Sequence, residues 1–356
     1  MSVLAAVSLW SLAGMLALVA AASPPESRAP VQLTDVTRQT GIDFVHTDGS
    51  SGQRYIVETV CAGLATFDYN NDGRIDILFL SGTALPGSTN PPSTCRLYRN
   101  EGNWKFTDVT RPAGLAVPCY ALGVAIGDYD NDGHADIYLN NFGTNLLFRN
   151  RGDGTFADTT AHAGVADDPH VGAGACFLDM DADGDLDLFV GHYIDFTFEK
   201  HHFVRFNGHP AYVGPLNYAA TNNRMFRNNG DGTFTDVSIE SGIASHEGAA
   251  MGMVSADFDQ DGDTDIFVGN DEIGNALFLN DGRGRFQEAG LGSGTAYDFN
   301  GKAHGTMGVE CGDFDNDGLL DAYATSYQGE SPVLFRNLGS RLFEDVSAAT
   351  RANVNM

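Results

Sequence analysis

One acidic loop occurs five times in this chain, and this repeat constrains the fold more than any other feature. The first copy spans residues 63–80 and carries the loop Asp-Tyr-Asn-Asn-Asp-Gly-Arg-Ile-Asp at 68–76. In every copy an apolar segment precedes the loop and another follows it, which predicts a strand, a polar turn and a second strand. The first aspartate of the loop is Asp68, Asp128, Asp179, Asp257 or Asp313.

A second signature follows each loop. After the first loop it consists of Leu-Tyr-Arg-Asn at 97–100 and Phe-Thr-Asp-Val-Thr at 106–110, and it recurs at 147–160, 225–238, 277–290 and 334–347. The Asn-x-Gly and Gly-Asp-Gly steps inside it are typical of hairpin turns. Each repeat therefore predicts four short antiparallel strands, and such units repeated radially are the blades of a β-propeller. A linear β-solenoid is the alternative, but its coils are usually shorter, so an all-β propeller is favoured.

The sequence has one more outer-strand signature than it has acidic loops. A sixth outer-strand signature, Leu-Thr-Asp-Val-Thr at 33–37, has no acidic loop of its own. In a closed ring this strand would complete a blade begun at the C-terminus, but the C-terminal signature at 343–347 already belongs to the fifth loop. We therefore expect an incomplete propeller: the chain is a fragment, or the ring closes in an unusual way or stays open.

The loops share the pattern D-x-[DN]-x-D-G-x-x-D, which predicts cation sites. Positions 1, 3 and 5 direct three side-chain oxygens to one point, the glycine at 6 permits a sharp turn, and position 9 adds a carboxylate. Oxygen ligands of this number suit Ca²⁺ better than Zn²⁺ or Mg²⁺. An EF-hand needs Glu at position 12, which here is Phe79, Leu139, Val190, Val268 or Ala324, so EF-hands are excluded.

We thus predict about five Ca²⁺ sites, and five copies of one spacing argue against the alternative of solvated turns. The predicted side-chain ligands are Asp68, Asn70, Asp72, Asp76, Asp128, Asp130, Asp132, Asp136, Asp179, Asp181, Asp183, Asp187, Asp257, Asp259, Asp261, Asp265, Asp313, Asp315, Asp317 and Asp321. The backbone carbonyls at position 7, of Arg74, His134, Asp185, Asp263 and Leu319, are predicted as additional ligands.

The charge balance narrows the range of partners. With 47 acidic and 20 basic residues the formal net charge is −27, which repels nucleic acid and anionic membranes. The apolar share of 42% is too high for a disordered chain. We therefore expect a folded acidic protein that binds neither nucleic acid nor membrane.

The N-terminus predicts export. Residues 3–22 are apolar and end in Ala-Ala-Ala-Ser, like a signal peptide with its cleavage site, although a basic n-region is missing. An uncut signal anchor or a buried helix is the alternative. We predict a signal peptide over 1–22, a linker over 23–30, a propeller over 31–347 with an insert near 192–221, and a tail over 348–356. No later segment is apolar enough to span a bilayer, so we expect a secreted, extracellular or periplasmic protein.

The repeats resemble the FG-GAP/VCBS repeats of integrin α-chain propellers, and more closely those of the cartilage-acidic-protein-like family. The matching stretches are 44–46 with Glu58, the loop at 128–133, the signature at 147–156, 297–302 and 307–308. Members carry a calcium-loop propeller, usually seven-bladed, and a small C-terminal ASPIC/UnbV domain. Here the later blades and that domain are absent, and the insert lacks an expected cysteine. The resemblance implies calcium binding and an extracellular interaction role such as cell adhesion, without an established activity.

Catalytic signals are scattered. No nucleophile elbow, zincin motif or dinucleotide fingerprint is present, so we predict no catalytic residue. We expect the central channel mouth to be lined by His46, Glu58, His246, Glu247 and His304. A loose cluster in the insert is either a transition-metal site or a solvated loop; it comprises His192, His201, His202 and His209.

The cysteine count is odd, which leaves at least one thiol unpaired in an exported protein. Cys61, Cys95 and Cys119 fall in the first two repeats, where one disulfide among them is conceivable. Cys176 and Cys311 fall within inner strands, where we expect buried thiols.

Three function classes remain open. We favour a binding module that presents loops to an extracellular protein or glycan. The alternative is an enzyme, a polysaccharide lyase or hydrolase with its site on the propeller face or in the channel, and the third is a structural spacer held together by calcium. An acid–base constellation in the channel or under the insert would favour the enzyme, whereas a flat face with an aromatic rim would favour binding.

Overall fold

Antiparallel strands dominate the computed structural model, which describes residues 32–61, 63–167 and 170–352. The chain divides into two compact units, Met1–Val36 and Thr37–Met356, and the architecture that follows is that of the second unit. The predicted signal peptide and linker lie outside the described residues. Among the residues that are described, no helix is long and apolar enough to cross a bilayer.

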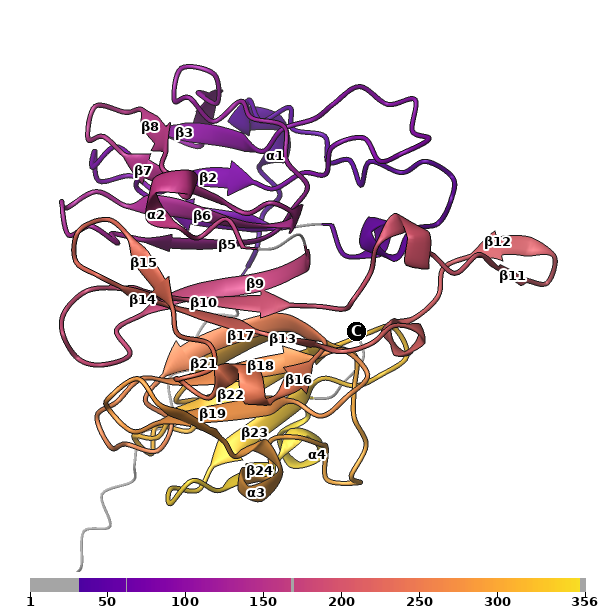
Figure 1. Ribbon diagram of the computed structural model, residues 1–356, viewed down its shortest axis with the longest axis vertical. Coiled ribbons are helices and arrows are strands. Elements are labelled where there is room, and N and C mark those ends of the chain that lie inside the picture. Colours follow the sequence, from indigo (N-terminus) through magenta and orange to yellow (C-terminus); the bar gives the residue numbers. More distant parts are fainter. Residues whose placement is uncertain (1–31, 62, 168–169, 353–356) are drawn as a thin grey trace, which may run out of the picture. The chain divides into compact units, whose positions relative to one another are not determined.

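Five four-stranded units follow one another along the chain, and we call them sheets 1 to 5 (Figure 1). Sheet 1 has β1 (Leu64–Phe67), β2 (Asp76–Phe79), β3 (Arg96–Gly102) and β4 (Lys105–Asp108); sheet 2 has β5 (Ala121–Gly127), β6 (Asp136–Gly143), β7 (Leu146–Asn150) and β8 (Phe156–Asp158). Sheet 3 has β9 (His170–Leu178), β10 (Asp187–His192), β14 (Arg224–Asn228) and β15 (Phe234–Asp236); sheet 4 has β17 (Ala250–Ala256), β18 (Asp265–Asn270), β19 (Ala276–Asn280) and β20 (Phe286–Glu288). Sheet 5 has β21 (Thr306–Gly312), β22 (Asp321–Ser326), β23 (Val333–Asn337) and β24 (Phe343–Asp345).

The remaining elements are short. Four one-turn helices are α1 (Thr37–Thr40), α2 (Thr160–Ala163), α3 (Gly290–Ser293) and α4 (Ser347–Thr350), and four 3-10 turns span Ile56–Thr59, Phe198–Lys200, Pro215–Asn217 and Ile243–Ser245. The insert between β10 and β14 carries the hairpin β11 (Val204–Phe206) and β12 (His209–Ala211), and β13 (Thr221–Asn222) pairs with β16 (Glu247–Gly248).

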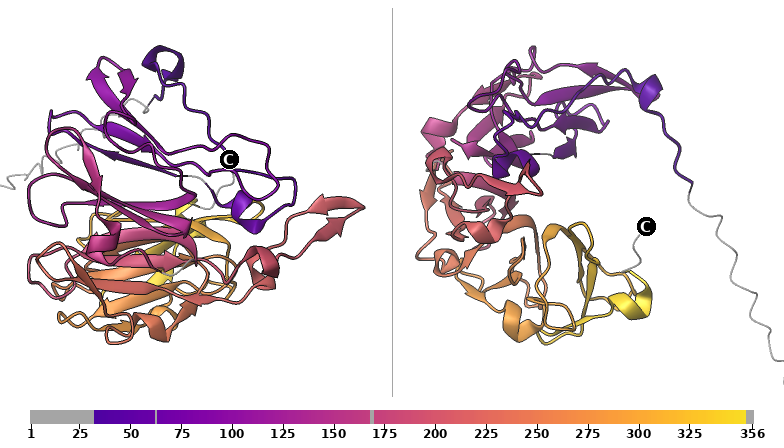
Figure 2. Two further views of the ribbon diagram at one scale, coloured as in Figure 1. Left: turned by 45° about the horizontal axis from the view of Figure 1, so that its top comes forward. Right: turned by 90° about the vertical axis from the view of Figure 1, so that its right-hand side faces the viewer.

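The sheets pack as consecutive propeller blades. Their first strands β1, β5, β9, β17 and β21 contact one another in that order, and the sheets follow in chain order in the right-hand view of Figure 2. Sheets 2 and 3 are also joined by a short pairing of β6 with β9. The predicted all-β fold of four-stranded blades is confirmed. Among the described residues no strand pairing connects sheet 1 with sheet 5.

The sixth outer-strand signature is not a strand here. Residues 33–36 have no regular structure, and Thr37 already begins α1. In the other repeats the same signature is a strand because a hairpin partner precedes it, for example β7 before β8. The prediction of an outer strand at 33–37 is therefore wrong for this structure, since a strand needs a neighbour that satisfies its backbone groups.

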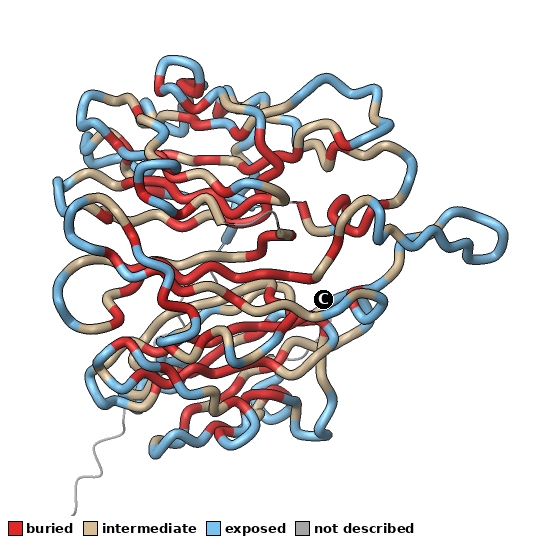
Figure 3. The backbone as a smooth tube through the Cα atoms, in the orientation of Figure 1, coloured by how far each residue is buried: buried red, intermediate tan, exposed pale blue. Residues whose placement is uncertain are grey.

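The core lies between successive sheets, whose facing side chains pack together. Buried residues follow the strands, and exposed residues follow the loops and the hairpin of the insert (Figure 3). The second residue of the acidic loop shows this. Tyr69, Tyr129, Met180 and Phe258 are at most 4% exposed, whereas the equivalent Phe314 in sheet 5 is 42% exposed. The difference arises because the following sheet covers the first four, and no sheet of the described residues follows sheet 5.

An asparagine at the end of the third strand ties neighbouring blades together. The Asn228 side-chain amide donates to the carbonyl of Leu186 in its own loop (3.0 Å) and to that of Tyr129 in the preceding loop (2.7 Å). Its Oδ1 accepts the Gly230 N–H. Asn150, Asn280 and Asn337 make the same bond to the preceding loop. Asn100 in sheet 1 donates only to Ile75 of its own loop.

We predict that Asn228→Ala lowers the free energy of unfolding by about 2–4 kcal/mol, because two buried carbonyls and one N–H lose their partner. Asn100→Ala should cost about 1 kcal/mol less, since Asn100 makes no bond to a preceding loop. Urea unfolding of both variants in one buffer measures the difference. Equal losses would show that the bond between blades contributes nothing.

Two cysteines meet in the core between sheets 1 and 2. The sulfur atoms of Cys95 and Cys119 lie 3.5 Å apart, whereas the thiol of Cys61 donates to the carbonyl of Ala121 at 3.7 Å. All five cysteines are free thiols in this structure. Cys176 and Cys311 do lie in inner strands, but they are half-buried rather than fully buried. Of the three candidates for a disulfide, the fold brings Cys95 and Cys119 together.

We expect oxidative folding to form the Cys95–Cys119 disulfide and to stabilise the chain by about 3 kcal/mol. Alkylation of the denatured, unreduced protein followed by peptide mass mapping should label Cys61 and leave the other two unlabelled. Cys95→Ser should release Cys119 for labelling, and Cys61→Ser should leave the disulfide intact. Labelling of Cys95 and Cys119 in the oxidised wild-type chain would contradict this pairing.

Candidate metal centres

Each acidic loop connects the first and second strands of its sheet, and its ninth residue begins the second strand. These ninth residues are Asp76, Asp136, Asp187, Asp265 and Asp321, the first residues of β2, β6, β10, β18 and β22. The loops therefore all lie at the same end of their strands. At the other end of β10 the chain enters the insert, so the third loop and the insert are separated by the length of this strand.

The first aspartate shapes the turn. In the second loop Asp128 Oδ1 accepts the N–H of Asp132 at 3.0 Å, and Oδ2 accepts the N–H of Gly133 at 2.8 Å. The same two bonds occur in the other four loops. Gly133 has a φ of +85°, a conformation that side chains disfavour, which explains the glycine at position 6. The turn is thus organised by its own backbone hydrogen bonds.

The ninth aspartate is buried and joins the loop to the third strand. Asp136 is 0% exposed; its Oδ2 accepts the N–H of Tyr129 at 3.1 Å, and its Oδ1 that of Asn150 at 2.7 Å. Burial raises the pKa of Asp136 to about 7, and the two backbone hydrogen bonds only partly oppose this. Burial raises the pKa of Asp187 and of Asp265 to about 7 in the same way. A cation beside these carboxylates would offset the cost of their lost hydration.

The side-chain oxygens at position 3 of the acidic loops indicate whether a cation fits there. Asn70 Oδ1, Asp130 Oδ1 and Asp181 Oδ1 are buried, and no hydrogen-bond donor of the described structure reaches them. A buried acceptor without a donor is costly, and a bound cation would satisfy it. In loops 2 to 5 one oxygen from each of positions 1, 3 and 9 lies within 4.8 Å of the other two. These acid-rich groups can hold a metal ion, and their oxygen-only donors fit a hard cation.

Position 5 is used differently from positions 1, 3 and 9. Asp132 Oδ1 accepts the N–H of His134, and Asp132 Oδ2 pairs with Arg149 at 2.9 Å. Arg149 also pairs with Asp130. The fifth aspartates do not belong to the close groups of three oxygens. Their role as ligands, like that of the position 7 carbonyls, stays a prediction.

Arginines that precede the asparagine of the third strand pair with loop carboxylates, and this role was not predicted from the sequence. Arg149 and Arg336 directly precede Asn150 and Asn337, and Arg336 Nε lies 3.0 Å from Asp315 Oδ2. Sheet 4 has Leu279 at this place, and Arg341 of the next sheet pairs with Asp259 at 2.7 Å instead. The available signal was the repeated Arg-Asn step; its contacts depend on how the third strand passes the loop.

The insert histidines do not gather into one site. His201 Nε2 lies 3.0 Å from the carbonyl of Gln53, the His202 ring lies 5.2 Å from that of Tyr218, and His209 is exposed in β12. Among the described residues none of these three belongs to a group of potential metal ligands. Of the two alternatives for the insert histidines, a metal site shared by His192 with these three residues is therefore wrong. His192 instead turns toward Asp167 and His170.

Two of the residues expected at the channel mouth, Glu58 and His304, contact different partners. Glu58 is buried and accepts the hydroxyl hydrogen of Tyr212 from the insert at 2.7 Å. His304 Nε2 lies 3.1 Å from Asp298 Oδ2. A pocket of about 260 Å³ borders the insert, and its lining includes Tyr193, Tyr212, Asp271, Glu272 and Tyr327. Within it the Tyr193 hydroxyl donates to Asp271 at 2.6 Å, and burial raises the pKa of Asp271.

Comparisons with known proteins agree with the repeat architecture. A family model described as FG-GAP-like repeat matches residues 68–139, 128–190, 211–268 and 257–324. Cartilage acidic protein 1 of Xenopus tropicalis is 27% identical over 303 residues, which cover 80% of this chain and 42% of that protein. The human protein of the same name is 33% identical over 177 residues, 47% of this chain and 23% of its own length. The chain thus spans less than half of the length of these relatives.

Among solved structures, a lectin of Agrocybe aegerita that recognises non-reducing terminal N-acetylglucosamine has a TM-score of 0.42 and 18% identity, covering 80% of this chain and 64% of the lectin. A likeness this low supports no inference about a ligand. The family matches, by contrast, run from 68 to 190 and from 211 to 324, more than half of the chain, and coincide with the acidic loops and their blades. The chain therefore belongs to the FG-GAP-like repeat family of β-propellers and is similar to cartilage acidic protein 1.

Proposed function

We propose that this chain is a secreted, calcium-binding propeller that acts as an extracellular interaction module for a protein or glycan partner. The observation that carries the interaction role is the projecting insert, whose apolar side chains face solvent. The acidic loops carry the calcium part of the proposal. The predicted signal peptide supports export.

Calcium is supported by the chemistry of the loops. Their donors are carboxylate, amide and carbonyl oxygens, which Ca²⁺ prefers, and the buried oxygens at position 3 have no donor from the described structure. The net charge of −27 adds a general attraction for divalent cations. Since each loop is hydrogen-bonded to its blade, an ion in the loop would stabilise the contact between blades as well.

The insert between β10 and β14 supports the interaction role. Phe203 is 53% exposed, Phe206 72% and Leu216 66%. Phe206 ends β11 and Phe203 directly precedes it, and the β11–β12 hairpin extends away from the sheets (Figure 1). The Arg205 guanidinium lies over the Phe203 ring, 5.5 Å from its centre. Aromatic side chains beside arginine, held on a projecting hairpin, are typical of protein interfaces. Exposed apolar groups of this kind are stabilised when a partner covers them.

The pocket at the base of the insert supports the glycan alternative for the partner. Its tyrosines offer flat apolar faces, and Asp271 and Glu272 offer acceptors for sugar hydroxyls. We propose binding rather than catalysis there, because the buried acid Asp271 already accepts the hydrogen of the Tyr193 hydroxyl. Turnover of a bound glycan would instead support the enzyme alternative.

We predict that chelation of calcium lowers the melting temperature markedly, since each site contributes about 2.7 kcal/mol at a calcium concentration of 100 times Kd. Calorimetric titration of the chelated protein should count about five ions. Asp130→Ala should remove one of them, and Glu240→Ala, outside the loops, should remove none. An unchanged melting temperature on chelation would contradict calcium binding.

We predict that Phe206→Ser weakens partner binding at least about 10-fold and leaves the melting temperature unchanged, because the side chain is exposed. Binding is measured on a glycan array and on a panel of extracellular-matrix proteins, in calcium buffer. Leu291→Ser, at a 74% exposed apolar position outside the insert, is the matched control. Failure of the wild-type chain to bind any probe, or equal binding by the Phe206 variant, would refute the role of the insert.

A further inference from the structure

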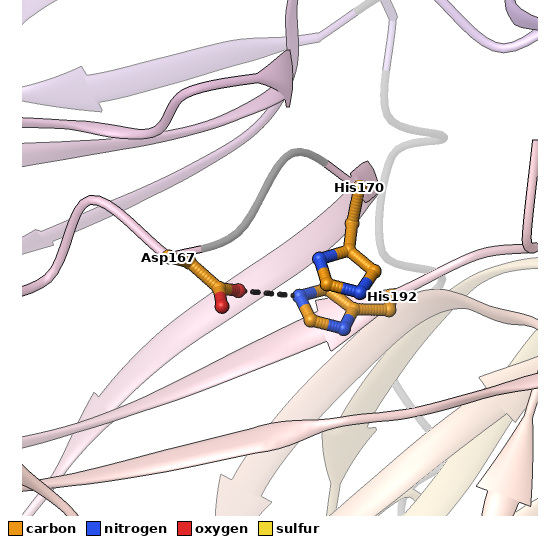
Figure 4. A group of neighbouring side chains, drawn as sticks. All are labelled: Asp167, His170 and His192. Carbon is orange, nitrogen blue, oxygen red and sulfur yellow. Dashed lines mark hydrogen bonds and ion pairs between the residues drawn. The ribbon is translucent and has the colours of Figure 1, made fainter. Parts of the chain in front are cut away.

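We propose that Asp167, His170 and His192 form a binding site for a divalent transition-metal ion, separate from the acidic loops. Figure 4 shows the three side chains beside one another at the end of sheet 3 that leads into the insert. Each contributes one potential ligand atom, and these atoms lie within 4.8 Å of one another. The site does not depend on the proposed calcium or partner binding.

The backbone brings these residues together. His170 begins β9 and His192 ends β10, and the pairing of the two strands shifts in register between Val190 and His192. Such an irregularity re-aims a side chain, and here the two imidazole rings lie stacked, with centres 4.3 Å apart and planes 7° from parallel. Because an imidazole donates to a metal in the plane of its ring, binding of one ion by both residues would turn the His170 ring out of this stack. Asp167 precedes β9 and has a φ of +55°. The side chains of His192 and Asp167 are only 1% and 5% exposed.

The hydrogen-bond partners of His192 indicate which ring nitrogen carries a hydrogen and which presents a lone pair to Asp167. Nδ1 lies 2.7 Å from the carbonyl oxygen of Asn222, which only accepts, so Nδ1 carries a hydrogen. In the neutral ring Nε2 then presents a lone pair, and it lies 2.7 Å from Asp167 Oδ2. Two acceptors at this distance repel unless a proton or a cation lies between them. A metal ion is such a cation, and an Nδ1–H bond to a carbonyl is the usual support of a metal-bound histidine.

Equivalent positions in other blades show that the repeat itself does not need a histidine here. Asn141 in sheet 2 and Asn270 in sheet 4 occupy this place, and their side-chain amides donate to the carbonyls of Thr144 and Gly274. The backbone N–H donates to the oxygen of a following asparagine side chain in all three blades. His192 Nδ1 therefore makes the same kind of hydrogen bond to a backbone carbonyl as the asparagine amide does in the other two sheets. Nε2 is an additional group, and it is the one aimed at Asp167.

The donor set selects the class of metal. Two imidazole nitrogens and one carboxylate oxygen suit Zn²⁺, Fe²⁺ or Co²⁺ rather than Ca²⁺, and three protein ligands leave room for water. The other oxygen of Asp167 lies 3.4 Å from Arg224 Nε, so Asp167 would offer the ion one oxygen. A proton on His192 Nε2 is the competing explanation of the short contact, and the experiment separates the two.

The test uses the whole chain with its loops saturated by millimolar Ca²⁺, titrated with Zn²⁺ by calorimetry and with Co²⁺ by absorbance. We expect one ion per chain, with the ligand-field bands of nitrogen and oxygen coordination. His192→Asn installs the residue of the equivalent positions, so it should keep the melting temperature and lower the affinity at least about 10-fold. His170→Ala should have the same effect on affinity, whereas His209→Ala, at an exposed position of β12, should bind like wild type.

A Zn²⁺ or Co²⁺ affinity that His192→Asn and His170→Ala leave unchanged would overturn the proposal, and so would the absence of binding to wild type. In the latter case the short contact between His192 and Asp167 is a hydrogen bond without a metal. A calcium-dependent melting temperature together with no Zn²⁺ binding would leave the calcium proposal intact and refute only this site.

Discussion

The structure depends on a pair of buried polar groups that recurs in sheets 2 to 5: the ninth aspartate of the acidic loop and the asparagine that ends the third strand. The Asp187 carboxylate receives one backbone N–H from its own loop and one from Asn228, and the Asn228 amide then reaches the carbonyl of Tyr129 in the preceding blade. Because all of these groups are buried, each is stable only while the other is in place. The acidic loops are therefore positioned by the packing of the blades and in turn connect them.

This constraint places two kinds of chemistry at opposite ends of the strands. The oxygen-rich loops sit where the second strands begin, and in sheet 3 the insert and the Asp167–His170–His192 group sit where β10 ends. Hard oxygen donors at one end and imidazoles at the other would favour different cations. Arginines such as Arg149 and Arg341 pair with the loop carboxylates, which lowers the repulsion among them.

Sequence reasoning was accurate where one repeat contains all of the information. The loop spacing predicted the strands on either side and the convergence of positions 1, 3, 5 and 9, because nine consecutive residues determine that turn. Positions 1, 3 and 9 do lie together in loops 2 to 5, whereas position 5 does not belong to these groups. It did not reveal the role of Asn228, whose partner Tyr129 lies 99 residues away. The repeated Asn was visible, but its bond to the preceding blade exists only once two blades are packed.

The insert shows the same difference between local features, which the sequence reveals, and contacts that form only on packing. Its aromatic and histidine content was apparent from the sequence, yet His192 joins Asp167 and His170 rather than His201, His202 and His209. By itself the sequence determined the repeat, the four-stranded blade and the acidic turn, because these are set by local hydrophobic alternation and by glycine and aspartate at fixed spacing. The tertiary structure alone decided which polar groups are buried together, such as Cys95 with Cys119, because packing of one blade on the next brings distant residues within bonding distance.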